Sequence, residues 1–230
     1  MILNDKKYNL ILIIIFLLSS CVNTVNDNIA QTNNIERVNP SIKIDNKYKI
    51  TPSSLRLNLL SQYSKTHYGN PLIYLNNPQI IVVHSAETPN LNVTVNIFEN
   101  DILIGRPDIE AGGEVNVGAH FLVDFDGTIY ANTPEQYIAR HTVGFNYTAI
   151  GIENIGYADN LTKEQLDSNV MLIKYLRNKY KSIKYVIAHY EYGNKTSPHY
   201  SLYKELNTKY INPAKKDPGT NFMNELRKRI

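Results

Sequence analysis

The sequence has few cysteines and little net charge, and it lacks a long hydrophobic run. Its single cysteine, Cys21, excludes an intramolecular disulfide. The formal charge of +3 gives no argument for binding to nucleic acid. The apolar run Leu10–Leu18 has nine residues, whereas a membrane-spanning helix needs about 20. With 43% hydrophobic and 20% charged residues, the 230-residue chain is expected to form one globular domain with appendages.

The N-terminal residues have the pattern of an export signal. Lys6 and Lys7 precede the apolar run, and small residues lead to Cys21. The run Leu18–Cys21 looks like a bacterial lipobox, in which cleavage leaves the cysteine as a lipidated N-terminus. We therefore predict a lipoprotein signal peptide at 1–20; the alternatives are an ordinary leader with a chance cysteine and a retained short anchor.

The segment 21–50 is rich in asparagine and has no sustained periodicity. It is predicted to be the lipid-bearing cysteine followed by a flexible tether. These features predict a protein held at a membrane of the cell envelope through a lipid on Cys21, on the outer membrane or in the periplasm if the cell is diderm.

Residues 51–230 carry alternating helix and strand patterns. Apolar spacing predicts helices at 53–66, within 92–107, at 162–179 and from about 221, the third beginning with a capping box at Thr162. Apolar runs predict strands at 79–84, 149–155 and 183–188, and Asp126-Gly127 predicts a hairpin between 119–124 and 128–130. The expected fold is a single α/β domain with a central mixed sheet flanked by helices.

Two histidines, His84 and His189, each end a predicted strand. Parallel strands that end together would bring both imidazoles to one edge of the sheet, where a loop ligand would complete a zinc site. Asp217, before Pro218-Gly219, is the candidate third ligand, although a helix N-cap is an equal alternative at this point. His199 and Glu191 compete for the same role, and no compact HExxH-type motif is present.

Six segments in one order resemble a known family. They are Ile81–His84, Asn116–Asp124, Asp126–Tyr130, Ala139–His141, Ile150–Glu153 and Lys215–Gly219. Together they resemble the zinc-dependent N-acetylmuramoyl-L-alanine amidases of the type-2 amidase family, whose fold is shared by phage amidases and peptidoglycan recognition proteins. The resemblance covers about residue 53 to the end and implies the amidase/peptidoglycan-recognition-protein-like fold.

The resemblance also implies roles for residues. It places the zinc ligands on His84, His189 and Asp217, the catalytic glutamate on Glu153 and the catalytic lysine on Lys215. Some members have a catalytic tyrosine where this chain has Ala119, which assigns the chain to the branch that uses the glutamate. Beside these, His141 and Asn146 are predicted to contact substrate at the pocket edge, with a structural role as an equal alternative for each.

These roles have alternatives. Glu153 could be a structural partner of Arg140, and Lys215 could belong to a solvated lysine pair. His189 and Asp217 also lie 28 positions apart, wider than in shorter family members, so 190–213 is an inserted segment of unassigned role.

The expected function is zinc-dependent hydrolysis of the amide between N-acetylmuramic acid and L-alanine in peptidoglycan or muropeptides, by a protein expected to be a monomer. Two alternatives remain at this stage. A recognition lipoprotein would bind peptidoglycan without cutting it, and a zinc peptidase would cut within peptides.

Overall fold

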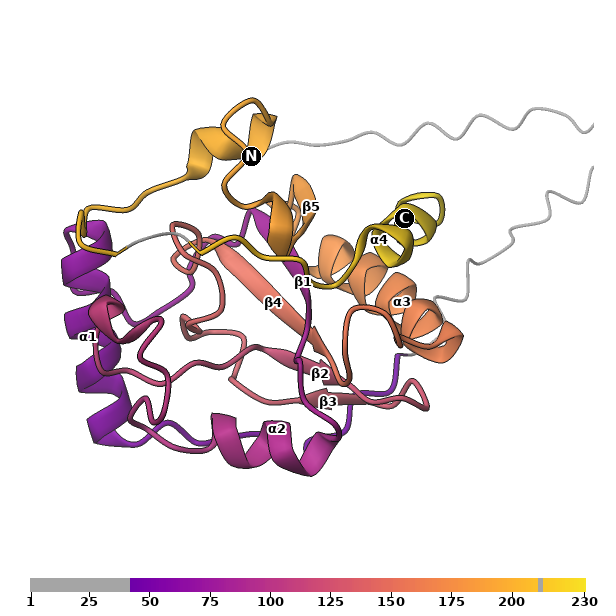
Figure 1. Cartoon of the computed structure of the whole chain (residues 1–230), viewed down its shortest axis with the longest axis horizontal. Helices are drawn as coiled ribbons and strands as arrows, with labels where there is room; N and C mark the ends of the chain where they lie inside the picture. The colour runs from indigo at the N-terminus through magenta and orange to yellow at the C-terminus, as the bar shows by residue number, and fades with distance from the viewer. Residues whose placement is uncertain (1–41, 211–212) are drawn as a thin grey trace, which may run out of the picture. The chain divides into compact units, whose positions relative to one another are not determined.

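The computed structural model describes residues 42–210 and 213–230, which belong to one compact unit. Its centre is a mixed five-stranded sheet in the order β3-β2-β4-β1-β5 (Figure 1). The strands are β1 (Ile80–Ser85), β2 (Phe121–Val123), β3 (Ile129–Ala131), β4 (Ala149–Asn154) and β5 (Tyr185–Ala188). Only β2 and β3 pair antiparallel; β1 pairs parallel with β4 and β5, and β2 with β4. The predicted mixed-sheet α/β fold is confirmed.

Side chains alternate between the two faces of β1 and β4, as the period of two in a strand requires. Ile81, Val83 and their neighbours in β4 pack with α3 (Lys163–Lys179) and α4 (Thr220–Arg227) in the largest core cluster. Ile80 and Val82 face the other way, into a second core closed by loop residues. His84, two positions after Val82, therefore projects on the face opposite α3.

The helix α3 begins as the sequence predicts. The Thr162 hydroxyl accepts from the Gln165 N–H, and the Gln165 side chain accepts from the Thr162 N–H. This reciprocal cap satisfies two of the amides that a helix start leaves unpaired. Figure 1 shows α1 (Ser54–Tyr68) on the other side of the sheet from α3, so helices flank the sheet as expected.

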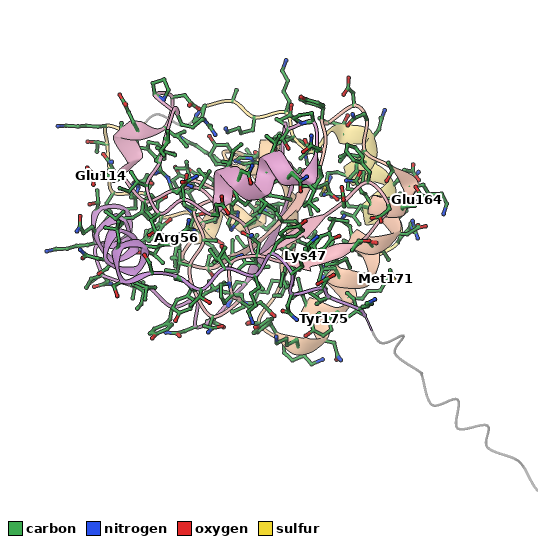
Figure 2. The ribbon with its side chains drawn as sticks, turned by 90° about the horizontal axis from the view of Figure 1, so that it is seen from below. Lys47, Arg56, Glu114, Glu164, Met171 and Tyr175 are labelled. Carbon is green, nitrogen blue, oxygen red and sulfur yellow. The ribbon has the colours of Figure 1, made fainter. Side chains whose placement is uncertain are left out.

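Apolar residues recur along α1 at Leu55, Leu59 and Tyr63, a spacing that predicts one buried face. The observed buried face differs from this prediction. Leu59 and Tyr63 are buried, but Leu55 is 46% exposed. Arg56 is buried in its place and extends toward the end of α2 (Leu91–Phe98), where it donates to the Phe98 carbonyl at 2.6 Å and pairs with Asp101 (Figure 2). The inward residue in this turn is thus Arg56, next to the Leu55 that apolar spacing predicts to be buried.

The helix predicted within 92–107 is shorter than expected. It ends at Phe98, and Ile102 forms an isolated bridge with Val115 instead of extending the helical face. Asn116 explains part of this ending, because its side chain donates to the carbonyls of Ile97 and Asn100. Two carbonyls at the helix end are therefore satisfied by a side chain.

The predicted tether is too long at its C-terminal end. Residues 42–50 run along the edge strand β3: the Asp45 N–H donates to the Ile129 carbonyl, and the Ala131 N–H donates back to Asp45. Tyr48 packs edge-on against Tyr130 at 5.1 Å between ring centroids. An edge strand leaves backbone groups unpaired, and this segment satisfies them. The predicted signal peptide, Cys21 and the rest of the predicted tether lie outside the described residues.

Candidate metal centre and active-site cavity

Adjacent parallel strands bring the site together at their carboxyl ends. His84 pairs in register with Glu153 of β4, and Val83 pairs with Ala188, directly before His189. The turn that follows β5 places His189 beside His84. Asp217 comes from the loop before α4, whose N-cap is Gly219, so the helix-cap alternative for Asp217 is wrong.

The donor atoms of these three residues form a tight triangle. The Nδ1 atoms of His84 and His189 are 3.0 Å apart, and Asp217 Oδ2 lies 3.4 Å from the first and 2.9 Å from the second. All three residues are buried. Tetrahedral zinc with bonds of about 2.0–2.1 Å would separate its ligand atoms by roughly 3.3 Å. The triangle therefore fits a zinc ion, and the group could hold a metal.

The protonation states of His189 and Asp217 are those that bind a cation. Burial lowers the pKa of His189 to about 4. Burial also acts to raise the pKa of Asp217, but hydrogen bonds with His189 and His84 outweigh it and hold this pKa well below its usual range. A neutral imidazole and an ionised carboxylate at pH 7 are the forms that bind metal.

Glu153 lies on the same face as His84, in the next strand. Its Oε2 atom is buried without a hydrogen-bond partner, and burial raises its pKa to about 7. Arg140 does not pair with it, since that guanidinium donates to the carbonyls of Ile109, Gly113 and Val115. The structural alternative for Glu153 is therefore wrong, and the carboxyl group is left available at the cavity.

Lys215 joins Glu153 and the three candidate ligands in the lining of a cavity of about 410 Å³. The lysine is half-buried, whereas Lys216 is exposed. Lys215 thus departs from the solvated-pair alternative and faces the same space as the candidate ligands.

The competing ligand candidates have other partners. His199 lies 3.1 Å from the Glu191 carbonyl oxygen through its Nε2. The Glu191 carboxylate accepts from the Ala188 N–H and pairs with Arg227. Neither belongs to the group of ligand atoms at His84.

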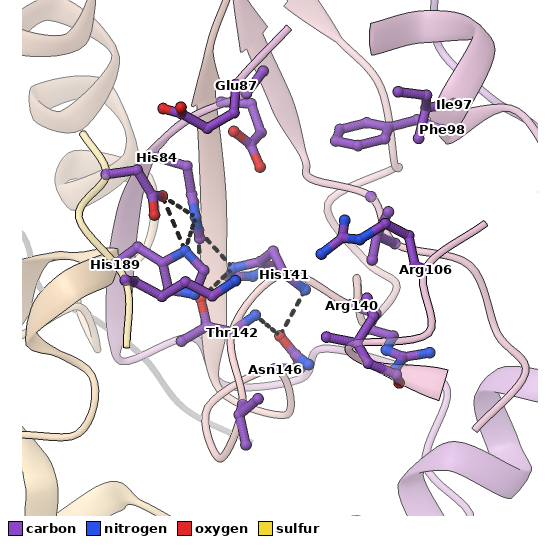
Figure 3. Close-up of a pocket in the computed structure, with 18 of the residues that line it drawn as sticks. His84, Glu87, Ile97, Phe98, Arg106, Arg140, His141, Thr142, Asn146 and His189 are labelled. Carbon is purple, nitrogen blue, oxygen red and sulfur yellow. Dashed lines mark hydrogen bonds and ion pairs between the residues drawn. The ribbon is translucent and has the colours of Figure 1, made fainter. Parts of the chain in front are cut away.

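The two residues predicted to contact substrate both line the cavity that the candidate ligands line. Asn146 is 1% exposed, and its Oδ1 accepts from the N–H groups of His141 and Thr142 while its Nδ2 donates to the Tyr63 hydroxyl. His141 lies against His84, with 3.1 Å between His141 Nδ1 and His84 Nε2 (Figure 3). These contacts favour a role in building the site over a contact with substrate.

Three residues that line the cavity were not predicted from the sequence: Thr142, Arg106 and Glu87. Thr142 directly follows His141, so the segment that contains His141 could have indicated it. Arg106, which points into the cavity opposite the histidines (Figure 3), lies on a loop where the sequence predicts the end of a helix. Glu87 has a left-handed φ of 54°, uncommon for a glutamate, and its N–H donates to the Gly156 carbonyl. No periodic pattern marks such loop residues.

Comparison with known proteins identifies the family. The family model described as N-acetylmuramoyl-L-alanine amidase matches residues 74–200. The endolysin of Escherichia phage T7 is 32% identical over 130 residues, covering 53% of this chain and 81% of the relative. The endolysin of Enterobacteria phage T3 is 30% identical over 132 residues, covering 54% and 82%. The chain belongs to the N-acetylmuramoyl-L-alanine amidase family, which confirms the predicted family and amidase activity.

A solved structure gives a similar match. The endolysin N-acetylmuramoyl-L-alanine amidase LysCS from Clostridium intestinale URNW is 29% identical, covers 55% of this chain and 79% of its own, and superposes with a TM-score of 0.41. The family match contains His84, Glu153 and His189 but ends before Lys215 and Asp217. The case for these last two residues therefore rests on the geometry of the cavity.

Proposed function

We propose that this protein is a zinc-dependent enzyme that hydrolyses the amide between the lactyl group of N-acetylmuramic acid and the L-alanine of a stem peptide. The observation that carries the zinc dependence is the buried triangle of two imidazole nitrogens and one carboxylate oxygen. His84, His189 and Asp217 would hold the ion. When bound, zinc would supply Lewis-acid chemistry, making water a better nucleophile near neutral pH and polarising a carbonyl.

In this proposal Glu153 is the general base and then the general acid. It accepts a proton from the water that attacks the lactyl carbonyl carbon, and delivers it to the L-alanine nitrogen as the carbon–nitrogen bond breaks. The pKa of about 7 suits both steps, because the carboxyl group exchanges protons near neutral pH. Its unpartnered Oε2 supports this assignment, since no hydrogen bond from residues 42–210 or 213–230 competes for it.

Lys215 is proposed to stabilise the negative charge that develops on the carbonyl oxygen. An ammonium group in a half-buried position acts more strongly than one in bulk water, because less solvent screens it. Its position two residues before Asp217 supports this role, since the loop that supplies the ligand also brings the lysine to the cavity.

Product analysis tests the proposal. Purified protein is incubated with muropeptides, with and without a chelator, and products are identified by mass spectrometry. Release of intact stem peptide that stops with the chelator and returns with Zn²⁺ is the expected result. Zinc binding without cleavage would favour peptidoglycan recognition, and shortened peptides would favour a peptidase.

The ligand assignment has its own test. We expect Asp217→Ala to lose zinc and activity together, because it removes the only anionic donor of the three. Metal analysis of the purified variant measures this directly. A full zinc content in Asp217→Ala would show that Asp217 is not a ligand.

A further inference from the structure

The imidazole of His84 is contacted on both of its nitrogens. Nδ1 faces His189 and Asp217, whereas Nε2 lies 3.1 Å from His141 Nδ1 and 3.4 Å from the Thr142 hydroxyl oxygen. The rings of His84 and His141 are nearly perpendicular, at 89°. Two neutral imidazoles can share a hydrogen bond in this arrangement only if one donates and the other accepts.

The second nitrogen of His141 decides which ring donates. His141 Nε2 lies 3.3 Å from the carbonyl oxygen of Ala149 in β4, and a carbonyl can only accept. This contact assigns the proton of His141 to Nε2, which leaves Nδ1 as an acceptor that faces both His84 Nε2 at 3.1 Å and the Thr142 hydroxyl oxygen at 2.9 Å. His84 then carries its proton on Nε2, and its Nδ1 lone pair faces His189 and Asp217. The Ala149 carbonyl thus sets the tautomer of His141 directly and the tautomer of His84 through the His141 ring.

The surroundings of His141 hold its ring in this place. Gly151 of β4 has no side chain, and a Cβ there would lie 2.8 Å from the Cγ of His141. The ring therefore packs directly on the strand. The Asn146 side chain fixes the turn, because it accepts from the N–H groups of His141 at 3.0 Å and Thr142 at 2.7 Å.

We propose that His141 is a positioning residue for the metal ligand His84: its Nδ1 accepts the Nε2–H of His84, orients that ring and keeps its Nδ1 unprotonated for the ion. This inference rests on the proposed zinc function. Histidine ligands usually donate their second N–H to a carboxylate, a backbone carbonyl or water, and losing such a partner costs about 10- to 100-fold in metal affinity or activity. Here a neutral imidazole takes that place.

Three variants separate positioning from packing. His141→Phe keeps a ring but has no acceptor. His141→Asn places an amide oxygen near the position of Nδ1 and can still accept from His84. Thr142→Val removes the hydroxyl that lies 2.9 Å from His141 Nδ1 and 3.4 Å from His84 Nε2 while preserving the side-chain shape, and so tests whether this hydroxyl is the partner that matters. Unfolding of each variant in excess chelator shows whether the metal-free fold survives.

Zinc affinity, measured by competition with a chromogenic chelator, is the main readout. His141→Phe is expected to bind zinc about 10- to 100-fold more weakly, with His141→Asn and Thr142→Val close to the wild type. Long-range proton–nitrogen NMR of the zinc-loaded wild type should find both His84 and His141 protonated on Nε2.

The outcomes distinguish the two proposals. Equal zinc affinity of His141→Phe and wild type would overturn the positioning role alone, as would an equal loss in His141→Asn and His141→Phe. A His84 protonated on Nδ1 in the loaded protein would also overturn it. A wild type that binds no zinc would overturn the proposed function itself.

Discussion

At the scale of single residues, the cavity depends on ionisable groups whose burial changes their protonation. Glu153 has no hydrogen-bond partner for Oε2, and its pKa of about 7 follows mainly from burial. Hydrogen bonds donated to the carboxylate would favour its ionised form and lower this pKa. The unpartnered Oε2 therefore helps to keep the pKa of Glu153 near neutral pH.

Replacement of Glu153 by glutamine tests this view. We expect Glu153→Gln to lose activity by about 100- to 10,000-fold, because the amide cannot carry the proton, while it retains zinc. Rates on muropeptides and metal content of the same preparation give both numbers. Glu225→Gln, on the exposed face of α4, is the matched control and should keep both. Activity of Glu153→Gln near that of the control would exclude the general-base role.

His120 makes the folded state sensitive to acid. Its Nδ1 accepts from the Gly151 N–H, its Nε2 lies 3.0 Å from the Tyr137 carbonyl oxygen, and burial lowers its pKa to about 4. Because this pKa lies below the unfolded value of about 6.5, the unfolded chain binds more protons in that window. Stability from His120 is complete above pH 6.5 and is lost as pH falls toward 4.

We therefore expect the free energy of unfolding of the wild type to fall by about 2 kcal/mol more between pH 7 and pH 5 than that of His120→Asn. Asparagine cannot titrate but can still accept from Gly151, so the comparison isolates the charge. Urea unfolding at several pH values measures both slopes. Parallel slopes would mean that His120 does not titrate in this range.

At the scale of elements, sequence patterns predict most of the regular structure and the strand ends that carry the site. Alternation in β1 and β4 places His84 and Glu153 on one face, and parallel pairing aligns His84 with the end of β5. The capping box fixes the start of α3. These features are local, so a single sequence contains them.

The packing of the inserted segment could not be predicted in this way. His67 on α1 lies 2.7 Å from the Glu205 carboxylate and 2.8 Å from the Gly112 carbonyl oxygen, joining the insertion to two distant segments. The Asn207 side chain adds a bond to the Ala111 carbonyl. Such contacts span up to 138 residues and follow no period. The positions of Asn146 and His141 depend in the same way on one long-range partner each, Tyr63 and His84.

The contact between β4 and the His141 turn gives a prediction for an element. Gly151→Ala would place a Cβ 2.8 Å from the His141 ring. We expect a loss of about 1–3 kcal/mol in stability from overpacking, together with weaker zinc binding. Gly193→Ala, where a Cβ meets no heavy atom within 4 Å, is the control and should change little. Calorimetry and chelator competition measure the two effects, and a Gly151→Ala variant equal to the control would refute the close contact.

At the scale of the whole molecule, the proposed site lies within one compact unit. All the proposed site residues lie between positions 84 and 217, within the unit that the structure describes. In residues 42–210 and 213–230, no helix is long and apolar enough to cross a membrane. The sequence separately predicts a lipid on Cys21, which lies outside the described residues.

We therefore predict that Cys21→Ser separates location from activity. An acylated N-terminus gains about 0.8 kcal/mol of membrane affinity per buried methylene, so the wild type expressed in a bacterial host should incorporate labelled fatty acid and sediment with membranes. Cys21→Ser should incorporate none and remain in the supernatant.

Both proteins should cleave soluble muropeptides at equal rates, because the substitution lies outside the catalytic unit. Equal sedimentation of the two proteins would refute the lipid anchor, and a slower Cys21→Ser would mean that the N-terminal segment contributes to the site.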